Sequence, residues 1–250
     1  MAKIISVHSY RGGTGKSNLT ANLAVCLAAA RKRVAVVDTD IQSPGIHMLF
    51  GLTDTSEFRT LNDYLWERCR IGETAIEVTP DRVKETEGHV WLVPSSLHAG
   101  EITKVLREGY NVGLMNDGIQ DLIDELSLDY LLIDTHPGLN EETLLSIAIS
   151  DVLLVMLRPD RQDFQGTAVT VEVARKLEVR QLVMVLNKVL PSVIARGFLE
   201  EVTRAYGAPI LGVLPEAPEM LELGSSGLFT LQFPDHPLSA EIRQVATRLA

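Results

Sequence analysis

The segment Arg11-Gly12-Gly13-Thr14-Gly15-Lys16-Ser17 constrains this 250-residue chain more than any other feature. It directly follows the apolar run at residues 4–7 and directly precedes a helical pattern that begins at Asn18. Glycines in such a turn let consecutive backbone N–H groups converge on phosphate oxygens at the positive end of the following helix. Glycines alone are also typical of an ordinary tight turn, but the Gly-Lys-Ser ending favours a phosphate-binding loop. In such a loop Lys16 reaches the β- and γ-phosphates and the Ser17 hydroxyl ligates Mg²⁺.

Short apolar runs alternate with helical patterns along the whole chain. The runs lie at residues 4–7, 34–37, 90–93, 130–133, 152–156, 182–186 and 210–214. Near-continuous Val, Ile and Leu in strands separated by helices is typical of a parallel sheet buried on both faces. We therefore predict an α/β fold: a doubly wound, mostly parallel sheet of seven or eight strands, with helices on both faces and nucleotide at the strands' carboxyl ends.

Helical patterns cover residues 17–30, 116–127, 141–149, 167–177, 193–206 and 239–250. Residues 51–89 are the least regular part of the chain, with a short helix expected near residues 61–67. The length suits one domain, residues 1–250, and no linker or repeat divides it. We expect a cytoplasmic protein, because no apolar run approaches the roughly 18 residues of a membrane span and no signal segment precedes the first strand.

The net charge of −10 argues against a uniformly basic nucleic-acid binder. Residues 158–204 are the one positive stretch, with eight basic and six acidic side chains. A solvated helical face with paired charges is an alternative explanation for each of these basic residues. Cys26 and Cys69 have neither metal-ligand spacing nor a disulfide partner pattern, so both are expected to be reduced structural thiols.

Acidic residues follow two of the predicted strands. Asp38 and Asp40 come directly after the second apolar run, and Asp134 comes directly after the fourth. A lone Asp after a strand often caps a turn, but two acids downstream of a phosphate loop favour a functional site. We expect Asp134 to hold Mg²⁺ through water. His136 stands in a loop, and no partner motif accompanies it. An ordinary loop histidine is therefore favoured over one that binds metal or transfers a proton.

The phosphate loop departs from the standard Walker A pattern, because Tyr10 stands where the first glycine is expected. Gly-Gly-Thr-Gly-Lys-Ser preceded by a basic residue resembles the deviant Walker A loop of the ParA/MinD family of ATPases. In that family the first basic residue of the loop is typically lysine, and it reaches the partner's nucleotide across a sandwich dimer. The resemblance implies this role for Arg11, and a trans role is favoured over stabilising its own loop.

Four later segments extend the resemblance. Asp38-Thr39-Asp40-Ile41-Gln42 is similar to the family's first switch, with Ile41 in place of proline, and Asp134-Thr135-His136-Pro137-Gly138 is similar to its second. Leu186-Asn187-Lys188 and Gly212-Val213-Leu214-Pro215 match its adenine-side segments. The resemblance implies the cofactors ATP and Mg²⁺.

The roles implied by the resemblance divide into three sets. The catalytic residues would be Lys16, Asp38, Asp40 and Arg11, with Asp40 orienting the attacking water and Asp38 supporting the metal's water shell. The metal residues would be Ser17, Asp38 and Asp134. The nucleotide contacts would be Arg11, Gly12, Gly13, Thr14, Gly15, Lys16, Ser17, Asn18, Asn187 and Pro215, with Asn187 at the adenine edge.

Some branches of the family depend on residues that this chain lacks, and the resemblance to those branches is therefore weaker. Cys26 and Cys69 are wrongly placed to hold an iron–sulfur cluster between subunits. The last helical segment carries only Arg243 and Arg248 as basic residues, which favours a helix docked on the domain over a membrane-binding one. The ParA-like branch remains. It implies an ATP-bound homodimer that binds nonspecific DNA, associates with the nucleoid, positions a cargo, and hydrolyses ATP slowly until an adaptor protein stimulates it.

Alternatives stay open at this level. Arg11 in place of lysine hints at a carboxysome-positioning, McdA-like member, because such relatives also depart from the signature lysine. A MinD-type membrane-cycling ATPase and a small-molecule ligase or kinase of the dethiobiotin-synthetase type share the fold. A regulatory module that binds nucleotide but hardly hydrolyses it is disfavoured by the presence of Lys16, Asp38, Asp40 and Asp134.

Overall fold

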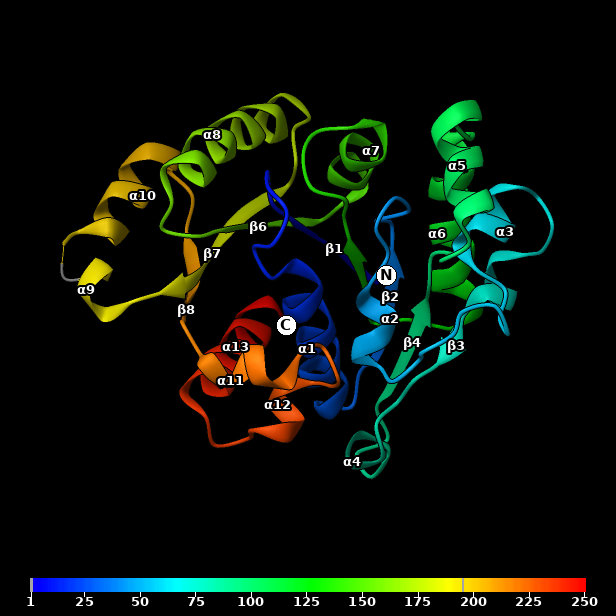
Figure 1. Ribbon diagram of the computed structural model, residues 1–250, viewed down its shortest axis with the longest axis horizontal. Coiled ribbons are helices and arrows are strands. Elements are labelled where there is room, and N and C mark those ends of the chain that lie inside the picture. Colours follow the sequence, from blue (N-terminus) through cyan, green and yellow to red (C-terminus); the bar gives the residue numbers. More distant parts are fainter. Residues whose placement is uncertain (1, 195) are drawn as a thin grey trace.

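An eight-stranded sheet forms the centre of the fold (Figure 1). The computed structural model describes residues 2–194 and 196–250. In chain order the strands are β1 (Lys3–His8), β2 (Arg33–Asp38), β3 (Ile76–Glu77), β4 (His89–Val93), β5 (Tyr130–Asp134), β6 (Val152–Leu157), β7 (Gln181–Val189) and β8 (Ile210–Pro215). Their order across the sheet is β3-β4-β2-β5-β1-β6-β7-β8. Every neighbouring pair is parallel except β3 and β4, so the carboxyl ends of seven strands meet at one edge.

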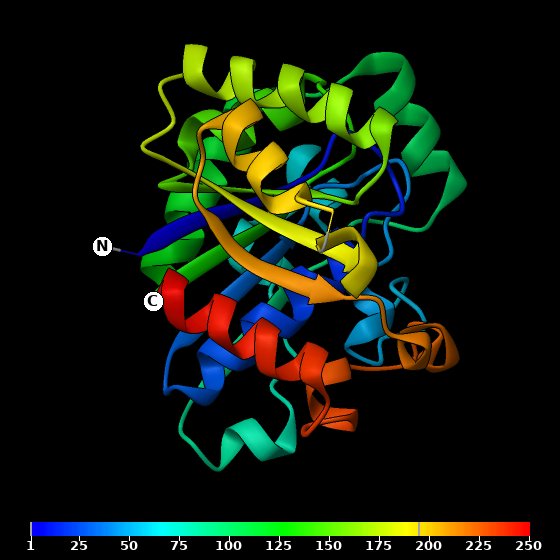
Figure 2. The same cartoon turned by 90° about the vertical axis from the view of Figure 1, so that its left-hand side faces the viewer.

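Helices cover both faces of the sheet, as the views in Figures 1 and 2 show. The face below the sheet in Figure 1 carries α1 (Lys16–Ala29), α2 (Ile46–Leu49), α4 (Asp81–Lys84), α11 (Pro218–Leu223), α12 (Phe229–Gln232) and α13 (Pro237–Leu249). The opposite face carries α3 (Leu61–Leu65), the 3₁₀ turn η1 (Ile71–Thr74), α5 (Ala99–Glu108), α6 (Val112–Glu125), α7 (Glu141–Ile149), α8 (Arg161–Lys176), α9 (Pro191–Ile194) and α10 (Phe198–Tyr206). The predicted doubly wound α/β fold is confirmed.

Alternating residues of each central strand pack into different cores. Val34 and Val36 of β2 pack with α1 and α13 in one core, whereas Ala35 and Val37 pack with α3 and α6 in another. On β6, Leu153 and its alternate neighbours belong to a third core under α8 and α10. Burial on both faces explains why these strands are apolar runs without polar alternation.

All seven predicted strands are confirmed within a few residues, and β3 was missed. The predicted helix over residues 193–206 is wrong as one element. Gly197 lies between α9 and α10 with a φ of 81°, and this left-handed residue is the one from which α10 starts. Two other helices begin earlier than expected. The Asp160 side chain caps α8 by accepting from the backbone N–H groups of Gln162 and Asp163, and Asn111 caps α6.

The last helix is docked on the domain, as its composition predicted. Leu238, Ile242, Val245, Ala246 and Leu249 of α13 are buried against α1 and β8. Within residues 2–194 and 196–250, every helix is too short or too polar to cross a membrane.

Candidate functional site

The phosphate loop connects β1 to α1 at the carboxyl edge of the sheet. Gly13 has a φ of 74°, and a Cβ built on it would meet nothing within 4 Å, so the space above the loop is open. Gly15 precedes α1 with a φ of 98°, which a side chain would strain. No side chain caps α1, so its first backbone N–H groups are free to bind an anion.

Two buried carboxylates lie side by side at the ends of β2 and β5. Asp38 and Asp134 are register partners across these strands, and both are almost completely buried. Thr39 bridges the strand ends, because its backbone N–H and its Oγ1 both donate to the Asp134 carbonyl at 3.0 Å. The Oγ1 of Thr20 donates to Oδ1 of Asp134 at 3.3 Å.

Burial makes the ionised forms of both acids costly. It raises the pKa of Asp134 to about 6, and it raises the pKa of Asp38 well above the usual range, with the Asp134 and Asp40 charges adding to the effect. A cation next to these carboxylates would therefore be strongly stabilised.

Lys16 is the cation that the chain itself supplies. Its side chain is buried, and its Nζ donates to the Oγ of Ser9 at 3.2 Å. Burial lowers the pKa of Lys16, while the carboxylates of Asp134, Asp40 and Asp38 raise it in part compensation. The loop lysine and the three predicted acids thus form one electrostatic cluster.

The cluster also fits a magnesium ion. Oδ2 of Asp38 is buried and has no hydrogen-bond partner, and Asp134 lies near the Ser17 hydroxyl. Among the described residues, no three His, Cys, Asp or Glu side chains form a complete metal cage. Mg²⁺ commonly binds through one or two carboxylates, water and phosphate oxygens, so an incomplete cage suits it. Ser17, Asp38 and Asp134 would hold it.

Asp40 faces a histidine for which the sequence indicated no role. His136 Nε2 lies 3.8 Å from Oδ1 of Asp40, so the segment after β5 meets the segment after β2. His136 Nδ1 lies 2.6 Å from the Pro137 carbonyl, which can only accept, so Nδ1 carries a proton. Burial raises the pKa of Asp40, and His136 opposes that shift.

A pocket of about 260 Å³ lies beside the phosphate loop. Asn187 is central to it: its Nδ2 donates to the Thr14 carbonyl at 2.7 Å, and its Oδ1 accepts from the backbone N–H of Lys188 at 2.9 Å. Lys188 has a φ of 57°, in an irregularity of β7 that turns this part of the strand toward the loop. The predicted residues that line the pocket are Gly13, Gly15, Asn18, Asn187 and Pro215. Adenine recognition by Asn187 stays a prediction.

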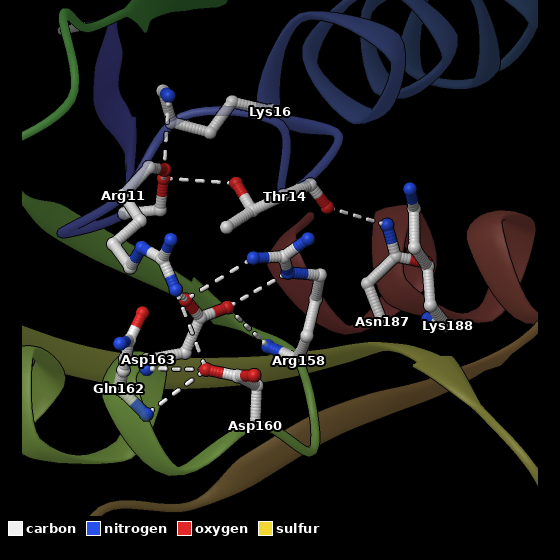
Figure 3. A network of polar contacts seen from close by, with 10 residues as sticks. Arg11, Thr14, Lys16, Arg158, Asp160, Gln162, Asp163, Asn187 and Lys188 are labelled. Carbon is white, nitrogen blue, oxygen red and sulfur yellow. Dashed lines mark hydrogen bonds and ion pairs between the residues drawn. The ribbon is translucent and has the colours of Figure 1, made fainter.

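Arg11 is bound within its own chain. Its Nη1 lies 3.4 Å from Oδ1 of Asp160 and 3.7 Å from Oδ1 of Asp163, as Figure 3 shows. Arg158 holds Asp163 from the other side, with its Nε 2.9 Å from Oδ2. The Arg11 side chain is 40% exposed, so it remains accessible to a partner.

Three residues just before the loop make contacts that the sequence analysis did not predict. Ser9 is fully buried and bonds to three residues of the loop. His8 Nδ1 lies 2.8 Å from the Thr135 hydroxyl. Tyr10 packs its ring on Gly166 of α8, where a Cβ would come within 1.9 Å of the ring. The departure from glycine at position 10 was the one available signal, because no motif covers residues 8 and 9.

Comparison with known proteins agrees with this geometry. The family model described as "ParA: NUBPL iron-transfer P-loop NTPase" matches residues 1–250. The chain belongs to the ParA family of P-loop NTPases. An uncharacterised ATP-binding protein of Methanocaldococcus jannaschii is 28% identical over 250 residues, which cover 100% of this chain and 88% of that relative.

Two solved structures share the ParA-family fold. MinD from Pyrococcus horikoshii, complexed with Mg-ADP, has a TM-score of 0.82 at 21% identity and covers 100% of this chain and 96% of its own. MinD in the MinC:MinD cell division complex of Aquifex aeolicus has a TM-score of 0.83 at 22% identity and covers 99% and 96%. The predicted cofactors of the family, ATP with Mg²⁺, are thereby confirmed.

Proposed function

We propose that this ParA-family protein is a Mg²⁺-dependent ATPase that works as a positioning switch. ATP binding produces a homodimer that binds nonspecific DNA, and an adaptor protein stimulates hydrolysis, which releases the dimer and moves a cargo over the nucleoid. The observation that carries the ATPase part is the meeting of Lys16, Asp38, Asp40 and Asp134 at the sheet edge, next to an open phosphate loop.

The chain's own residues divide the work of hydrolysis. The free N–H groups at the start of α1 and the Lys16 ammonium bind phosphate oxygens and stabilise the charge that builds up in the transition state. Asp40 orients the attacking water, and Asp38 holds the Asp40 backbone, since Oδ1 of Asp38 accepts from the Asp40 N–H at 3.0 Å. Mg²⁺, when bound, neutralises phosphate charge.

Exposed apolar side chains support dimerisation through the nucleotide edge, by which we mean the edge of the sheet where the carboxyl ends of the parallel strands and the phosphate loop lie. Among the residues whose burial the structure describes, nine large hydrophobic side chains are exposed. Seven of them lie in the connections that follow the carboxyl ends of strands: Tyr10, Met48, Phe58, Leu97, Leu190, Ile194 and Leu221. The other two, Val169 and Leu177, lie on or just after α8. Apolar groups gathered at one edge are typical of an interaction surface.

The positive stretch, residues 158–204, supports a small DNA-binding surface. Five of its eight basic side chains have partners within the chain: Arg158, Arg175, Lys176, Arg180 and Arg196. In the described part of the chain, Arg161 on α8 and Arg204 on α10 are exposed and have no such partner. With two phosphate contacts from each protomer, a plot of the logarithm of the dimer's DNA-binding constant against the logarithm of the salt concentration would have a slope of about −4.

Iron transfer, named in the family description, is not part of our proposal. Burial raises the pKa of Cys26 to about 11, and the pKa of Cys69 is also raised by burial and by nearby Asp63 and Glu73. Thiolates, not thiols, hold iron, so both environments oppose cluster binding. A membrane-binding last helix is likewise disfavoured, because its apolar face is occupied by the core.

A DNA mobility-shift series with ATP, ADP and no nucleotide, repeated at rising salt, tests the proposal. We expect a shift with Mg-ATP only, weakening as salt rises. Light scattering of the same samples reports the dimer separately. A dimer with ATP but no DNA shift in any state would remove the DNA part and leave the ATPase switch. Turnover that needs a small-molecule acceptor instead of a protein partner would favour a ligase or kinase.

A further inference from the structure

The Ser9 hydroxyl uses all of its hydrogen-bonding capacity inside the phosphate loop. It donates to the Arg11 carbonyl at 2.6 Å, and it accepts from Thr14 Oγ1 at 2.8 Å and from Lys16 Nζ at 3.2 Å. A hydroxyl has one proton and two lone pairs, so no capacity is left for solvent or ligand. Ser9 is also fully buried, which makes each of these bonds costly to lose.

Backbone contacts fix Ser9 from both sides. It directly follows β1, and its carbonyl accepts from the Gly138 N–H at 3.3 Å, which ties it to the segment after β5. The hydroxyl therefore stands at a set position between the end of β1 and the segment after β5. The Thr14 that it binds is in turn held by Asn187, as Figure 3 shows for the labelled residues.

Lys16 needs such a fixed partner. The charges of Asp134, Asp40 and Asp38 act on its ammonium and raise its pKa against the effect of burial, so these carboxylates compete with a phosphate for the ammonium. An ammonium has three protons, so one bond to Ser9 leaves two for phosphate oxygens. A flexible four-carbon side chain loses less entropy on binding a ligand if it is already held in place.

We propose that Ser9 is the positioning residue for Lys16, which it holds so that two ammonium protons remain available to the β- and γ-phosphates. Ser9 acts through Lys16 and does not itself touch the nucleotide. This inference rests on the proposed nucleotide site, and it concerns a residue outside the loop motif.

Comparing ADP with AMP in the Ser9→Ala variant tests the inference. Lys16 of a phosphate loop serves the β- and γ-phosphates, which AMP lacks. We expect the Kd for Mg-ADP, measured by competition with a fluorescent ADP analogue, to rise roughly ten- to a hundredfold, as for a lost hydrogen bond to a charged group. The Kd for AMP should change by less than about threefold, so the AMP-to-ADP ratio of Kd values falls.

The Lys16→Ala background supplies a second arm. If Ser9 acts through Lys16, Ser9→Ala should cause no further loss of ADP affinity once the lysine is absent. Ser6→Ala is the matched control, because Ser6 is a fully buried serine of β1, the strand that Ser9 directly follows, and its hydroxyl bonds to Ser146 and Ser150 instead of the loop. The AMP-to-ADP ratio of Kd values of the Ser6→Ala variant should equal that of the wild type.

The outcomes separate the inference from the proposed function. Equal weakening of ADP and AMP by Ser9→Ala would mean loop collapse and overturn the inference, as would unchanged ADP binding or a further loss in the Lys16→Ala background. A wild-type protein that binds neither nucleotide would overturn the proposed function instead. Thermal unfolding of each variant without nucleotide identifies one that fails to fold. If Ser9→Ala does, Ser9→Cys, which keeps the size of serine but is a much weaker hydrogen-bonding group, replaces it in both arms with the same expected results.

Discussion

At the scale of single residues, Arg11 has competing partners. It is bound by Asp160 and Asp163 of its own chain, and in the proposed dimer it would leave them for the partner's nucleotide. Exposed ion pairs contribute little, with a median of about 0–1 kcal/mol, so this contact is weak enough to exchange. The intramolecular contact and the trans role are therefore compatible, and they can be separated by mutation.

We expect Arg11→Ala to bind ATP but to lose ATP-dependent dimerisation, because a guanidinium that bridges to the partner's phosphates is removed. Light scattering with ATP in a hydrolysis-blocked Asp40→Ala background measures this. Asp160→Asn is the matched control, since asparagine keeps the cap on α8 but removes one of the two carboxylate charges that bind Arg11. Arg11 would have only an intramolecular role if Asp160→Asn lost the dimer as Arg11→Ala does.

His8 gives the fold a defined response to acid. Burial, with the nearby charges of Lys16 and His136, lowers the pKa of His8 from 6.5 to about 3. Below pH 6.5 the unfolded chain binds a proton at His8 that the folded chain does not, so stability falls as the pH falls. Between pH 6.5 and pH 5 this loss should be about 2 kcal/mol.

A His8→Asn variant should lack that part of the acid loss, because an amide can donate to Thr135 without titrating. Urea unfolding of both proteins at pH 7.5, 6.5, 5.5 and 5.0 measures the difference. Parallel pH profiles for the two proteins would show that the pKa of His8 is the same in the folded and unfolded states.

Sequence patterns predicted the residues of this site unevenly. Lys16, Asp38 and Asp134 are implied by strand and loop motifs because a strand end fixes where the next side chain lies. Ser9 and His136 depend on contacts with residues far away in the chain, Ser9 with Gly138 and His136 with Asp40. No local pattern encodes such contacts, so neither partner could be predicted from the order of residues.

At the scale of elements, the central strands were predictable and the edge strand β3 was not. Strands buried on both faces must be apolar throughout, which leaves a clear signal. β3 has only two residues and pairs only with β4, so Ile76 and Glu77 leave almost none. The shortest helices between residues 46 and 84 were obscured for a related reason. Several span only four or five residues, and tertiary contacts rather than periodicity define them.

Gly88 tests how closely α1 packs against the loop before β4. A Cβ at this position would lie 1.8 Å from the Ala28 carbonyl oxygen, which is backbone and cannot rotate away. We expect Gly88→Ala to lower the free energy of unfolding by about 1–3 kcal/mol, as overpacking does. Urea unfolding measures it.

Gly100→Ala is the control for Gly88→Ala. Gly100 lies in α5 with open space around its Cβ position, so alanine should raise stability by up to about 1 kcal/mol through helix propensity. Equal effects of the two substitutions would contradict the close packing of Gly88 on α1.

At the scale of the whole molecule, the nucleotide edge differs from the rest of the surface. The phosphate loop, both acidic strand ends and most exposed large apolar side chains share it. Nucleotide binding by itself does not need exposed apolar side chains outside the pocket, such as Leu97 and Leu190. A second copy that covers this edge would remove them from water in the ATP-bound state alone, which couples ligand to assembly.

Placing a charge on this edge should block the dimer. Leu190 directly follows β7 and is 50% exposed, and it takes no part in the nucleotide pocket. In the Asp40→Ala background with ATP, Leu190→Glu should weaken dimerisation at least about tenfold, because the carboxylate would be buried without a partner. Leu177→Glu should leave it unchanged, since Leu177 follows α8 near the start of β7, at the opposite edge of the sheet. Analytical ultracentrifugation over a concentration series gives both dissociation constants. If Leu177→Glu weakened the dimer and Leu190→Glu did not, the two copies would meet through another face, and Arg11 could not reach the partner's nucleotide.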